Sequence, residues 1–410
     1  AGGNVLPVSG SYDVYEAFGE MFIPLAEGRP LFEDLNVELG YRLSDYSISG
    51  QSATWKAGIN WSPVESLRLR AMLQQANRAP NISELFSPIT TGLSNATFDP
   101  CSAGNPNPID ANLRALCEAT GVPPALVGVV GDIVSGQVNQ FGGTQPNALP
   151  GPETAETLTL GLVWSPSLNL PRVTDPLISI DYYDIQIDDF IGTFSGQEAM
   201  DACYVLADPA GCAGIVRING SLATSGAGLP GYNTNLTFRR AEGIEISANT
   251  GYDLGSWGNL DVNLNANYYL TNELQSAPFS AVVDCNGYYG TTCDPVPQLR
   301  IVQRTTWRFD DVELSYLWRH LSGMDAQTGE ATNLFPAFRS IEAYDYFDLA
   351  GSYRLNDNVR FNATVTNIFD EDPPVIGNST GTTSFNSGNT FPSLYDVLGR
   401  VYTVGVTVNF

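Results

Sequence analysis

The residues best suited to chemistry in this chain are its cysteines, because all of them fall in close pairs. The pairs are Cys101 and Cys117, Cys203 and Cys212, and Cys285 and Cys293. Each pair lies in a stretch rich in Gly, Pro or Asn, without CxxC spacing and without a neighbouring histidine. This pattern favours disulfides over zinc binding, and the short separations favour nearest-neighbour pairing. Disulfides in turn predict an oxidising compartment, such as the periplasm or the cell surface.

Other chemistry finds little support in the residues. Hydrolysis by a serine nucleophile needs a base, and the sole histidine is His320, in the segment WRHLSG at the end of a predicted strand. The simpler interpretation of His320 is a position in an aromatic girdle. With one histidine, the only haem site that remains possible is one with a single axial ligand. Two clusters of acidic residues could bind Ca²⁺ in the loops, although such clusters are more often solvated residues at the start of a loop. They are Asp184, Asp188 and Asp189, and Asp370, Glu371 and Asp372. We expect no enzyme activity, no cofactor and no metal other than this calcium alternative.

Composition excludes further classes of protein. With 19 basic and 44 acidic residues the formal charge is −25, so no basic surface is available for nucleic acid. A content of 40 Gly, 19 Tyr and 19 Phe is typical of strands, turns and aromatic belts. No apolar run is long enough for a transmembrane helix. This test does not detect membrane-spanning strands, in which apolar and polar residues alternate. The chain is therefore predicted to be all-β, and residues 1–410 read as one architecture without a separate soluble domain.

The strands alternate in a way that favours a membrane barrel. In residues 399–410 the residues Tyr402, Val404, Val406, Val408 and Phe410 share one face. Thr, Gly and Asn occupy the other face, and residues 259–271 repeat the pattern. A soluble sandwich would carry Lys and Glu on its wet face, whereas Asn, Thr, Ser and Gly are typical of a crowded barrel lumen.

Thirteen such strands are predicted, with short and long connections in alternation. Their ranges are 12–24, 34–46, 53–61, 66–77, 153–164, 177–190, 236–252, 259–271, 298–309, 311–320, 343–355, 358–368 and 399–410. Short turns on one rim and long loops on the other describe a transmembrane antiparallel β-barrel with periplasmic turns and extracellular loops. All three cysteine pairs fall in long loops, where a staple stabilises a polar segment by about 2–4 kcal/mol. Short helices are expected at 110–116 and 197–206 in these loops, and a slip of phase in 177–190 predicts a bulge near the outer rim.

An odd number of strands predicts that this barrel is incomplete. Single-chain bacterial barrels have even strand numbers, and open sheet edges in lipid would leave backbone groups unsatisfied. Because the chain starts Ala1-Gly2-Gly3 without an initiator Met or a signal peptide, it reads as a processed or partial product. We expect further polypeptide, from the same precursor or another chain, to complete the barrel.

Five motifs in order along the chain resemble TonB-dependent receptors. They are NRAPNISELF (77–86), GPETAETLTLGLVW (151–164), AEGIE (241–245), VTNIFDEDPP (365–374) and a closing segment with Tyr395, Gly399, Arg400 and Phe410. The resemblance implies a barrel of about 22 strands, of which this chain would supply the last 13, with an N-terminal plug and early strands outside it. It also implies an outer-membrane location and TonB-driven import of a scarce solute, such as a siderophore, vitamin or oligosaccharide.

Further expectations follow from the resemblance and from the loops. Phe410, with Val408, Val406 and Tyr402, resembles the signal read by the barrel assembly machinery, although an ordinary apolar strand end explains it too. Phe141, Tyr288 and Tyr289 are candidate ligand contacts, and loop packing is an equally good explanation for them. Expected partners are the plug, the TonB complex, outer-membrane lipid and lipopolysaccharide, and a surface lipoprotein. A passive porin-like channel and a structural or adhesive barrel remain as alternative functions.

Overall fold

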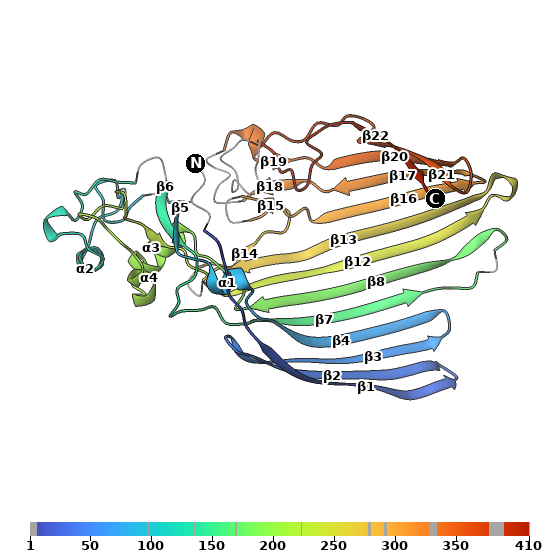
Figure 1. Cartoon of the computed structure of the whole chain (residues 1–410), viewed down its shortest axis with the longest axis horizontal. Helices are drawn as coiled ribbons and strands as arrows, with labels where there is room; N and C mark the ends of the chain where they lie inside the picture. Colours follow the sequence, from blue (N-terminus) through green and yellow to red (C-terminus); the bar gives the residue numbers. More distant parts are fainter. Residues whose placement is uncertain are drawn as a thin grey trace.

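The main body of the molecule is one antiparallel sheet (Figure 1). The computed structural model describes residues 6–96, 98–133, 137–168, 170–222, 224–277, 280–290, 293–327, 334–376 and 389–409. In sheet order the long strands are β1 (Val14–Arg29), β2 (Phe32–Tyr46), β3 (Gly50–Val64), β4 (Leu67–Arg78), β7 (Glu153–Trp164), β8 (Val173–Asp188), β12 (Phe238–Asp253), β13 (Asn259–Gln275), β16 (Leu299–Phe309), β17 (Val312–Leu321), β20 (Tyr344–Arg354), β21 (Val359–Thr366) and β22 (Val401–Val408). The 13 predicted strands are confirmed, with ends displaced by a few residues. No helix among the described residues is long and apolar enough to cross a membrane.

Each strand has an apolar and a polar face because successive side chains point to opposite sides of a sheet. Leu160 of β7 lies beside Tyr182 of β8, and Leu162 lies beside Ile180. The residues between them, Gly161 and Asp181 among them, point the other way. We call these two sides of the sheet the apolar face and the polar face. The cross-strand register carries the same division from β1 through β22.

Long connections gather at one end of the strands, the loop end, and short turns at the other, the turn end (Figure 1). Loop A comprises residues 79–152, loop B 189–237, loop C 276–298, loop D 322–343 and loop E 367–400. Their helices are α1 (Ile82–Phe86), α2 (Ala111–Ala119), α3 (Gly196–Tyr204) and α4 (Pro209–Ala213), with 3-10 turns at Pro124–Leu126 and Pro336–Phe338; a third such turn, Gly255–Trp257, lies at the turn end. Short strands complete the loops: β5 (Thr90–Asn95), β6 (Gln137–Gly142), β9 (Ile191–Gly192), β10 (Leu229–Pro230), β11 (Thr234–Asn235), β14 (Val283–Asp284), β15 (Tyr288–Tyr289), β18 (Met324–Ala326) and β19 (Ser340–Ile341).

The two loop helices expected from the sequence are confirmed at their predicted starts. Asp110 caps α2 by accepting a hydrogen bond from the Leu113 amide at 2.8 Å, and Gly121 follows the helix with a φ of +102°. Ser195 caps α3 in a reciprocal capping box with Glu198. Because such caps satisfy the free amides of the first helical turn, they fix the helix start locally.

The prediction of a bulge in residues 177–190, near the loop end, was wrong. β8 keeps an unbroken register with β7 from Asp188 to Ile178. Its irregularity lies toward the turn end, where the pairing with β12 shifts between Asn249 and Gly251. The apolar pattern changes phase for another reason: beyond Tyr182, the apolar face of β8 carries polar residues while Ile185 lies on the polar face. The strand stays regular, and the surroundings of its two faces change along it.

Candidate functional site on the polar face and the stapled loops

Basic side chains are concentrated on the polar face of the strands. By the register of the described strands, 13 of the chain's 19 basic residues lie there, whereas the apolar face carries Arg240 near the loop end. The 13 are Arg29, Arg42, Lys56, Arg68, Arg70, Arg78, Arg239, Arg300, Arg304, Arg308, Arg319, Arg354 and Arg360. A chain with a net charge of −25 thus directs most of its positive charge to one surface.

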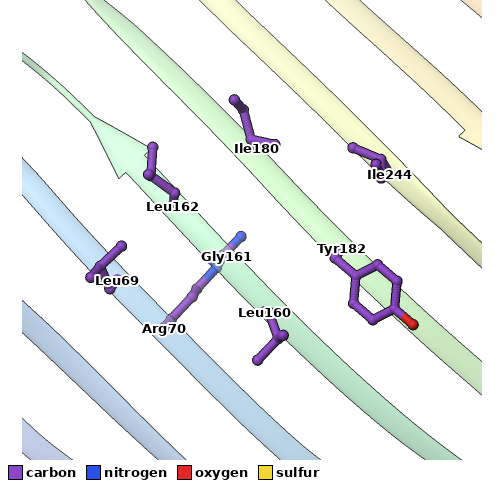
Figure 2. Close-up of a pocket in the computed structure, with 8 residues that line it drawn as sticks. All are labelled: Leu69, Arg70, Leu160, Gly161, Leu162, Ile180, Tyr182 and Ile244. Carbon is purple, nitrogen blue, oxygen red and sulfur yellow. The ribbon is translucent and has the colours of Figure 1, made fainter.

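Many of these cations pair with carboxylates across the strands. Arg70 reaches over β7 to Asp181 of β8, with its Nη2 atom 2.6 Å from Oδ1. The Arg70 side chain extends to Gly161 of β7 (Figure 2). A Cβ atom at Gly161 would lie 2.2 Å from the Asp181 Oδ1 atom and 2.4 Å from the Arg70 Nε atom. Glycine therefore leaves room for the close approach of these two side chains, and a larger residue would force the ion pair to shift.

The hollow drawn in Figure 2 lies mainly on the opposite side of the same strands. Its side chains from the apolar face are Leu69, Leu160, Leu162, Ile180, Tyr182 and Ile244. A solute site usually combines apolar walls with several converging polar groups, and this hollow has few polar atoms. It is a depression in an apolar surface and a poor candidate for binding a polar solute.

The motif at 77–86 joins the sheet to loop A. Arg78, at the end of β4, forms ion pairs with Glu84 of α1 at 2.9 Å and with Glu153 of β7 at 2.6 Å. Glu84 also closes a capping box with Asn81. The amide of Ile191, at the start of loop B, donates to Glu153 at 2.7 Å. These contacts fix the starts of both loops to the same corner of the sheet.

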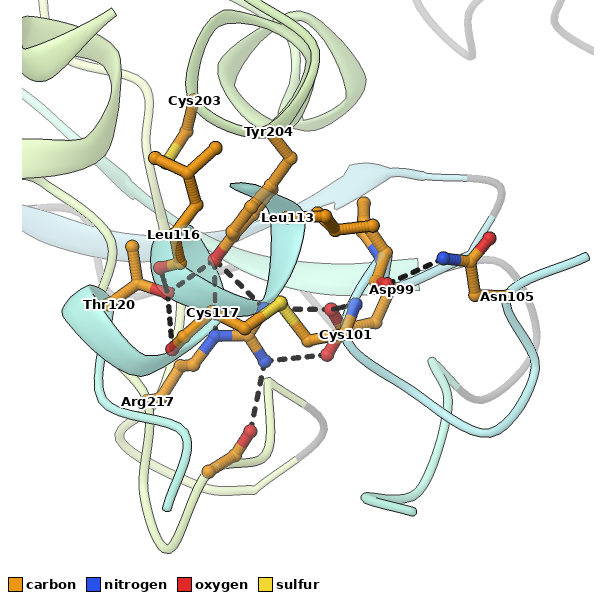
Figure 3. The surroundings of a disulfide bond; sticks show 12 residues. Asp99, Cys101, Asn105, Leu113, Leu116, Cys117, Thr120, Cys203, Tyr204 and Arg217 are labelled. Atoms are coloured by element: carbon orange, nitrogen blue, oxygen red, sulfur yellow. Dashed lines mark hydrogen bonds and ion pairs between the residues drawn. A yellow bond between two sulfur atoms is a disulfide. The ribbon is translucent and has the colours of Figure 1, made fainter. Parts of the chain in front are cut away.

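Loops A and B share a buried core that contains an ion pair. Arg217 of loop B donates through Nη1 to Asp99 Oδ2 of loop A at 2.6 Å, and both side chains are at most 1% exposed. The Arg217 guanidinium also donates to the Tyr204 hydroxyl at 2.9 Å, and Tyr204 is hydrogen-bonded to Thr120 at 2.8 Å (Figure 3). Burial acts to lower the pKa of Arg217, but the hydrogen bonds and charge attraction of Asp99 and Tyr204 together outweigh burial and raise the pKa. Burial raises the pKa of Tyr204.

The expected cysteine pairs are all formed. Cys101 is bonded to Cys117 and Cys203 to Cys212 in the core shared by loops A and B, and Cys285 is bonded to Cys293 in loop C. The first two disulfides each close one loop, and apolar residues such as Val122, Val138, Met200 and Leu222 pack around them. The two loops thus share one buried core.

A second core joins loops C, D and E above β17 and β20. Its fully buried members include Tyr289, Tyr346 and Phe391, with Ile376 and Tyr395 beside them. The rings of Tyr289 and Phe391 meet edge to face at 5.7 Å.

The three aromatic residues expected as ligand contacts do not lie together in one site. Tyr289 has no exposed surface and donates its hydroxyl to the Phe338 carbonyl at 2.8 Å, so in this structure it packs the loops. Burial raises its pKa to about 12. Tyr288 is half-buried in β15, and Phe141 is half-buried in β6, where it pairs with Thr91 of β5. Sequence reasoning missed the Asp99 and Arg217 pair because its members are 118 residues apart and carry no local signal.

Other predicted residues occupy surface positions. Tyr402 is 67% and Val406 55% exposed on the apolar face of β22, with Val408 on the same face, while Phe410 lies outside the described residues. His320, on the apolar face of β17, is bonded through Nδ1 to Asp345 Oδ1 at 2.9 Å and lies beside Trp318.

The candidate calcium residues have other contacts. Asp184 pairs with Arg240 at 2.8 Å, and Asp370 accepts from the Arg400 amide at 2.7 Å. The described part of the chain holds no group of three or more His, Cys, Asp or Glu residues placed to bind a metal ion.

Comparisons with known proteins agree with this architecture. A family model described as "TonB dependent receptor-like, beta-barrel" matches residues 3–368. No curated protein matches the chain.

Among solved structures, a mutant of the ferric enterobactin receptor PfeA from Pseudomonas aeruginosa is similar at 17% identity, with a TM-score of 0.59 over 97% of this chain and 45% of that one. The siderophore receptor PirA from Acinetobacter baumannii gives 15% identity and a TM-score of 0.58, over 97% and 46%. The copper transporter OprC gives 18% and 0.51, over 97% and 48%. At these identities the likeness shows the fold alone, and the chain spans about half the length of these structures.

Proposed function

Because the chain belongs to the TonB-dependent receptor family, we propose that it forms much of the barrel of an outer-membrane receptor that imports a scarce solute. The TonB complex would supply the energy. The observation that carries the proposal is the match of the family model to residues 3–368, on a sheet whose two faces are chemically distinct. Substrate, energy source and partners are proposals, because the chain spans about half the length of the solved structures that it resembles.

The faces of the sheet fit a barrel in lipid. The apolar face would contact the acyl chains, and the polar face would line the lumen. Aromatic groups lie toward both ends of the apolar face, as expected at membrane interfaces. At the turn end Trp307 stacks on Phe309 at 5.8 Å. At the loop end Phe347 meets Phe369 at 5.3 Å.

The remaining partners follow from this placement. The loop end would face the outside of the cell, and the turn end would face the periplasm. The disulfides of the loops would then lie in an oxidising environment. Within the described residues β1 and β22 are the two edges of the sheet, and we propose that further strands of the receptor pair with them while a plug fills the lumen. Lipopolysaccharide would surround the loop end, and a surface lipoprotein is a candidate partner of the loops.

The untested site residues have defined roles in this proposal. Tyr402, Val406, Val408 and Phe410 would guide barrel assembly. Tyr288 and Phe141, both half-buried, would contact solute if the loops rearrange. As one of the neighbours reported above is named a ferric enterobactin receptor and another a siderophore receptor, a ferric chelate is the first class of solute to test.

Energised uptake distinguishes an importer from a passive channel. Cells that express the full-length receptor should accumulate a radiolabelled ferric siderophore from a panel, and dissipation of the proton gradient should abolish the uptake. Cells without the receptor are the control. Uptake that persists without the gradient would support a porin-like channel. A receptor that imports nothing, and whose loop A deletion abolishes surface adhesion, would support an adhesive barrel.

A further inference from the structure

The hollow on the apolar face lies between two rows of side chains that run across the strands. One row comprises Leu69, Leu162 and Ile180, and the other comprises Leu160, Tyr182 and Ile244 (Figure 2). The hollow has a volume of about 340 Å³, and ligand pockets span about 300–1,000 Å³. Leu160 is 46% and Ile180 42% exposed. The chain leaves this apolar surface uncovered, so the hollow is suited to an apolar partner.

The apolar surface ends one row above the hollow, toward the loop end. In that row Leu158 of β7 lies beside Asp184 of β8, and Asp184 lies beside Glu242 of β12. Successive rows on one face are two residues apart along a strand, which is about 7 Å. β12 has 16 residues and is therefore about 50 Å long, whereas the apolar band of an outer-membrane barrel is about 25 Å tall. Asp184 and Glu242 thus mark the level at which these strands leave the hydrocarbon, and the hollow lies directly below that level.

Acidic side chains dominate the same side of the sheet from this level to the loop end. Among the described residues of β7, β8, β12 and β13, five carboxylates lie there with one basic residue, Arg240. The carboxylates are those of Glu156, Asp184, Asp188, Glu242 and Glu273. Arg240 forms ion pairs with three of them, at 2.8 Å, 3.4 Å and 3.7 Å. Five negative charges and one positive charge leave this surface clearly negative.

Tyr182 joins the hollow to this acidic surface. Its ring lines the hollow, and its hydroxyl donates to Glu242 at 2.8 Å. In Figure 2 the hydroxyl is the end of the ring farthest from Ile180. The side chains of Asp184 and Glu242 remain 26% and 20% exposed although both are paired with Arg240. A molecule seated in the hollow would therefore reach accessible carboxylates at the distance of one side chain.

We propose that the hollow binds an acyl chain of a membrane lipid whose head group ends in a primary ammonium, and that the ammonium contacts Asp184 and Glu242. A primary ammonium has three hydrogen-bond donors and no acceptor, which matches carboxylates that outnumber the bases around them. The same surface would repel an anionic head group. All acyl chains are equally apolar, so the shape of the hollow and the charge above it select the lipid. The site rests on the proposed function for its place in a membrane, but it requires neither TonB nor import.

The head-group test is lipid binding to the purified full-length receptor in detergent, measured by native mass spectrometry. The probes are phosphatidylethanolamine and phosphatidylglycerol with identical acyl chains. The wild-type receptor should bind the ethanolamine lipid about 2-fold to 5-fold more tightly, the range expected for partly exposed ion pairs. Glu242→Gln keeps an acceptor for the Tyr182 hydroxyl but removes one negative charge, and it should reduce the preference to less than about 2-fold. The matched control is Asp345→Asn, a carboxylate on the same face that pairs with His320 of β17, and it should leave the preference unchanged.

The hollow is tested separately by filling it. Leu160→Trp places a larger side chain in the hollow and should remove the preference for the ethanolamine lipid. Leu349→Trp is the matched control, because Leu349 lies on the apolar face of β20 outside the hollow and is 44% exposed. It should bind lipid as the wild type does. An ethanolamine lipid with a photoreactive acyl chain should label peptides that contain residues 158–164 and 178–184.

Several outcomes would overturn the lipid site. Equal affinity for the two lipids, or tighter binding of the glycerol lipid, would refute the ammonium contact. Binding that requires Mg²⁺ would assign the carboxylates to a metal-bridged phosphate instead. Equal losses in the two tryptophan variants, or labelling spread evenly over the strands, would show that the hollow is not a distinct site.

Two further controls keep the test independent of folding and of import. If Glu242→Gln lowers the thermal unfolding midpoint, Glu273→Gln replaces it, because Glu273 forms the longest of the three ion pairs with Arg240, and it should also reduce the preference. A receptor that shows the lipid preference but imports no solute would contradict the importer and leave the lipid site intact. Energised import by a receptor without the preference would overturn the lipid site alone.

Discussion

The buried ion pair between Asp99 and Arg217 gives the sharpest prediction about the loops. Asp99→Asn keeps an oxygen acceptor for the Cys101 amide, which donates to Asp99 at 2.9 Å, but leaves the Arg217 charge without its partner. Arg217→Met leaves the Asp99 charge alone. Both side chains are at most 1% exposed, so each single change should cost about 3–5 kcal/mol of local stability. The double variant buries neither charge and should cost clearly less than the sum of the two.

Hydrogen exchange measured peptide by peptide is the suitable assay, because the barrel itself should stay folded. At 1.4 kcal/mol per factor of ten, each single change should accelerate exchange in α2 and α3 by about 100-fold to a few thousand-fold. Exchange in β7 and β8 should not change. Arg114→Met, an exposed arginine on α2, is the control and should cost about 0.5 kcal/mol or less. The reasoning fails if acceleration is confined to one loop, or if the double variant loses as much as the sum of the singles.

Three smaller predictions follow. Gly161→Ala should lower the thermal unfolding midpoint of the barrel by displacing the partly exposed ion pair of Arg70 and Asp181, at a cost of about 1 kcal/mol. Gly405→Ala, with no atom within 4 Å of the added Cβ, should be neutral, and equal effects would refute the crowding argument. Burial raises the folded pKa of Tyr204 above its ordinary 10.0, so the stabilising effect of this tyrosine is complete below pH 10.0 and is lost as the pH rises through the folded pKa. The difference in tyrosinate absorbance between wild type and Tyr204→Phe should therefore show a group that ionises above pH 10.0. Ionisation at or below pH 10.0 would contradict the burial of Tyr204. Mild reductant followed by alkylation and peptide mapping should open the disulfide of Cys212 first, since Cys212 is half-buried while the other five cysteines are at most 4% exposed, and earlier labelling of any other pair would refute this order.

The sequence by itself determined the strands, their faces and the covalent links of the loops. Each depends on neighbours in the chain: alternation in a segment such as 259–271 sets the two faces, Asp110 and Ser195 start their helices, and cysteines 8 to 16 residues apart meet without help from distant segments. The same local view failed in residues 177–190, where a change of phase predicted a bulge. A change of phase can mean a bulge, or a regular strand whose two faces change surroundings along its length. Only the register with β7 distinguishes the two.

Only the tertiary structure decided which polar residues meet. Asp99 and Arg217, like Arg70 and Asp181, lie more than a hundred residues apart, and no periodicity in the chain links them. The tertiary structure also placed Tyr289 and Tyr395 inside one core, although in the sequence both look like ordinary loop residues. Packing of separate loops decides which side chains are buried and which partners they meet, and neither can be read from the local sequence.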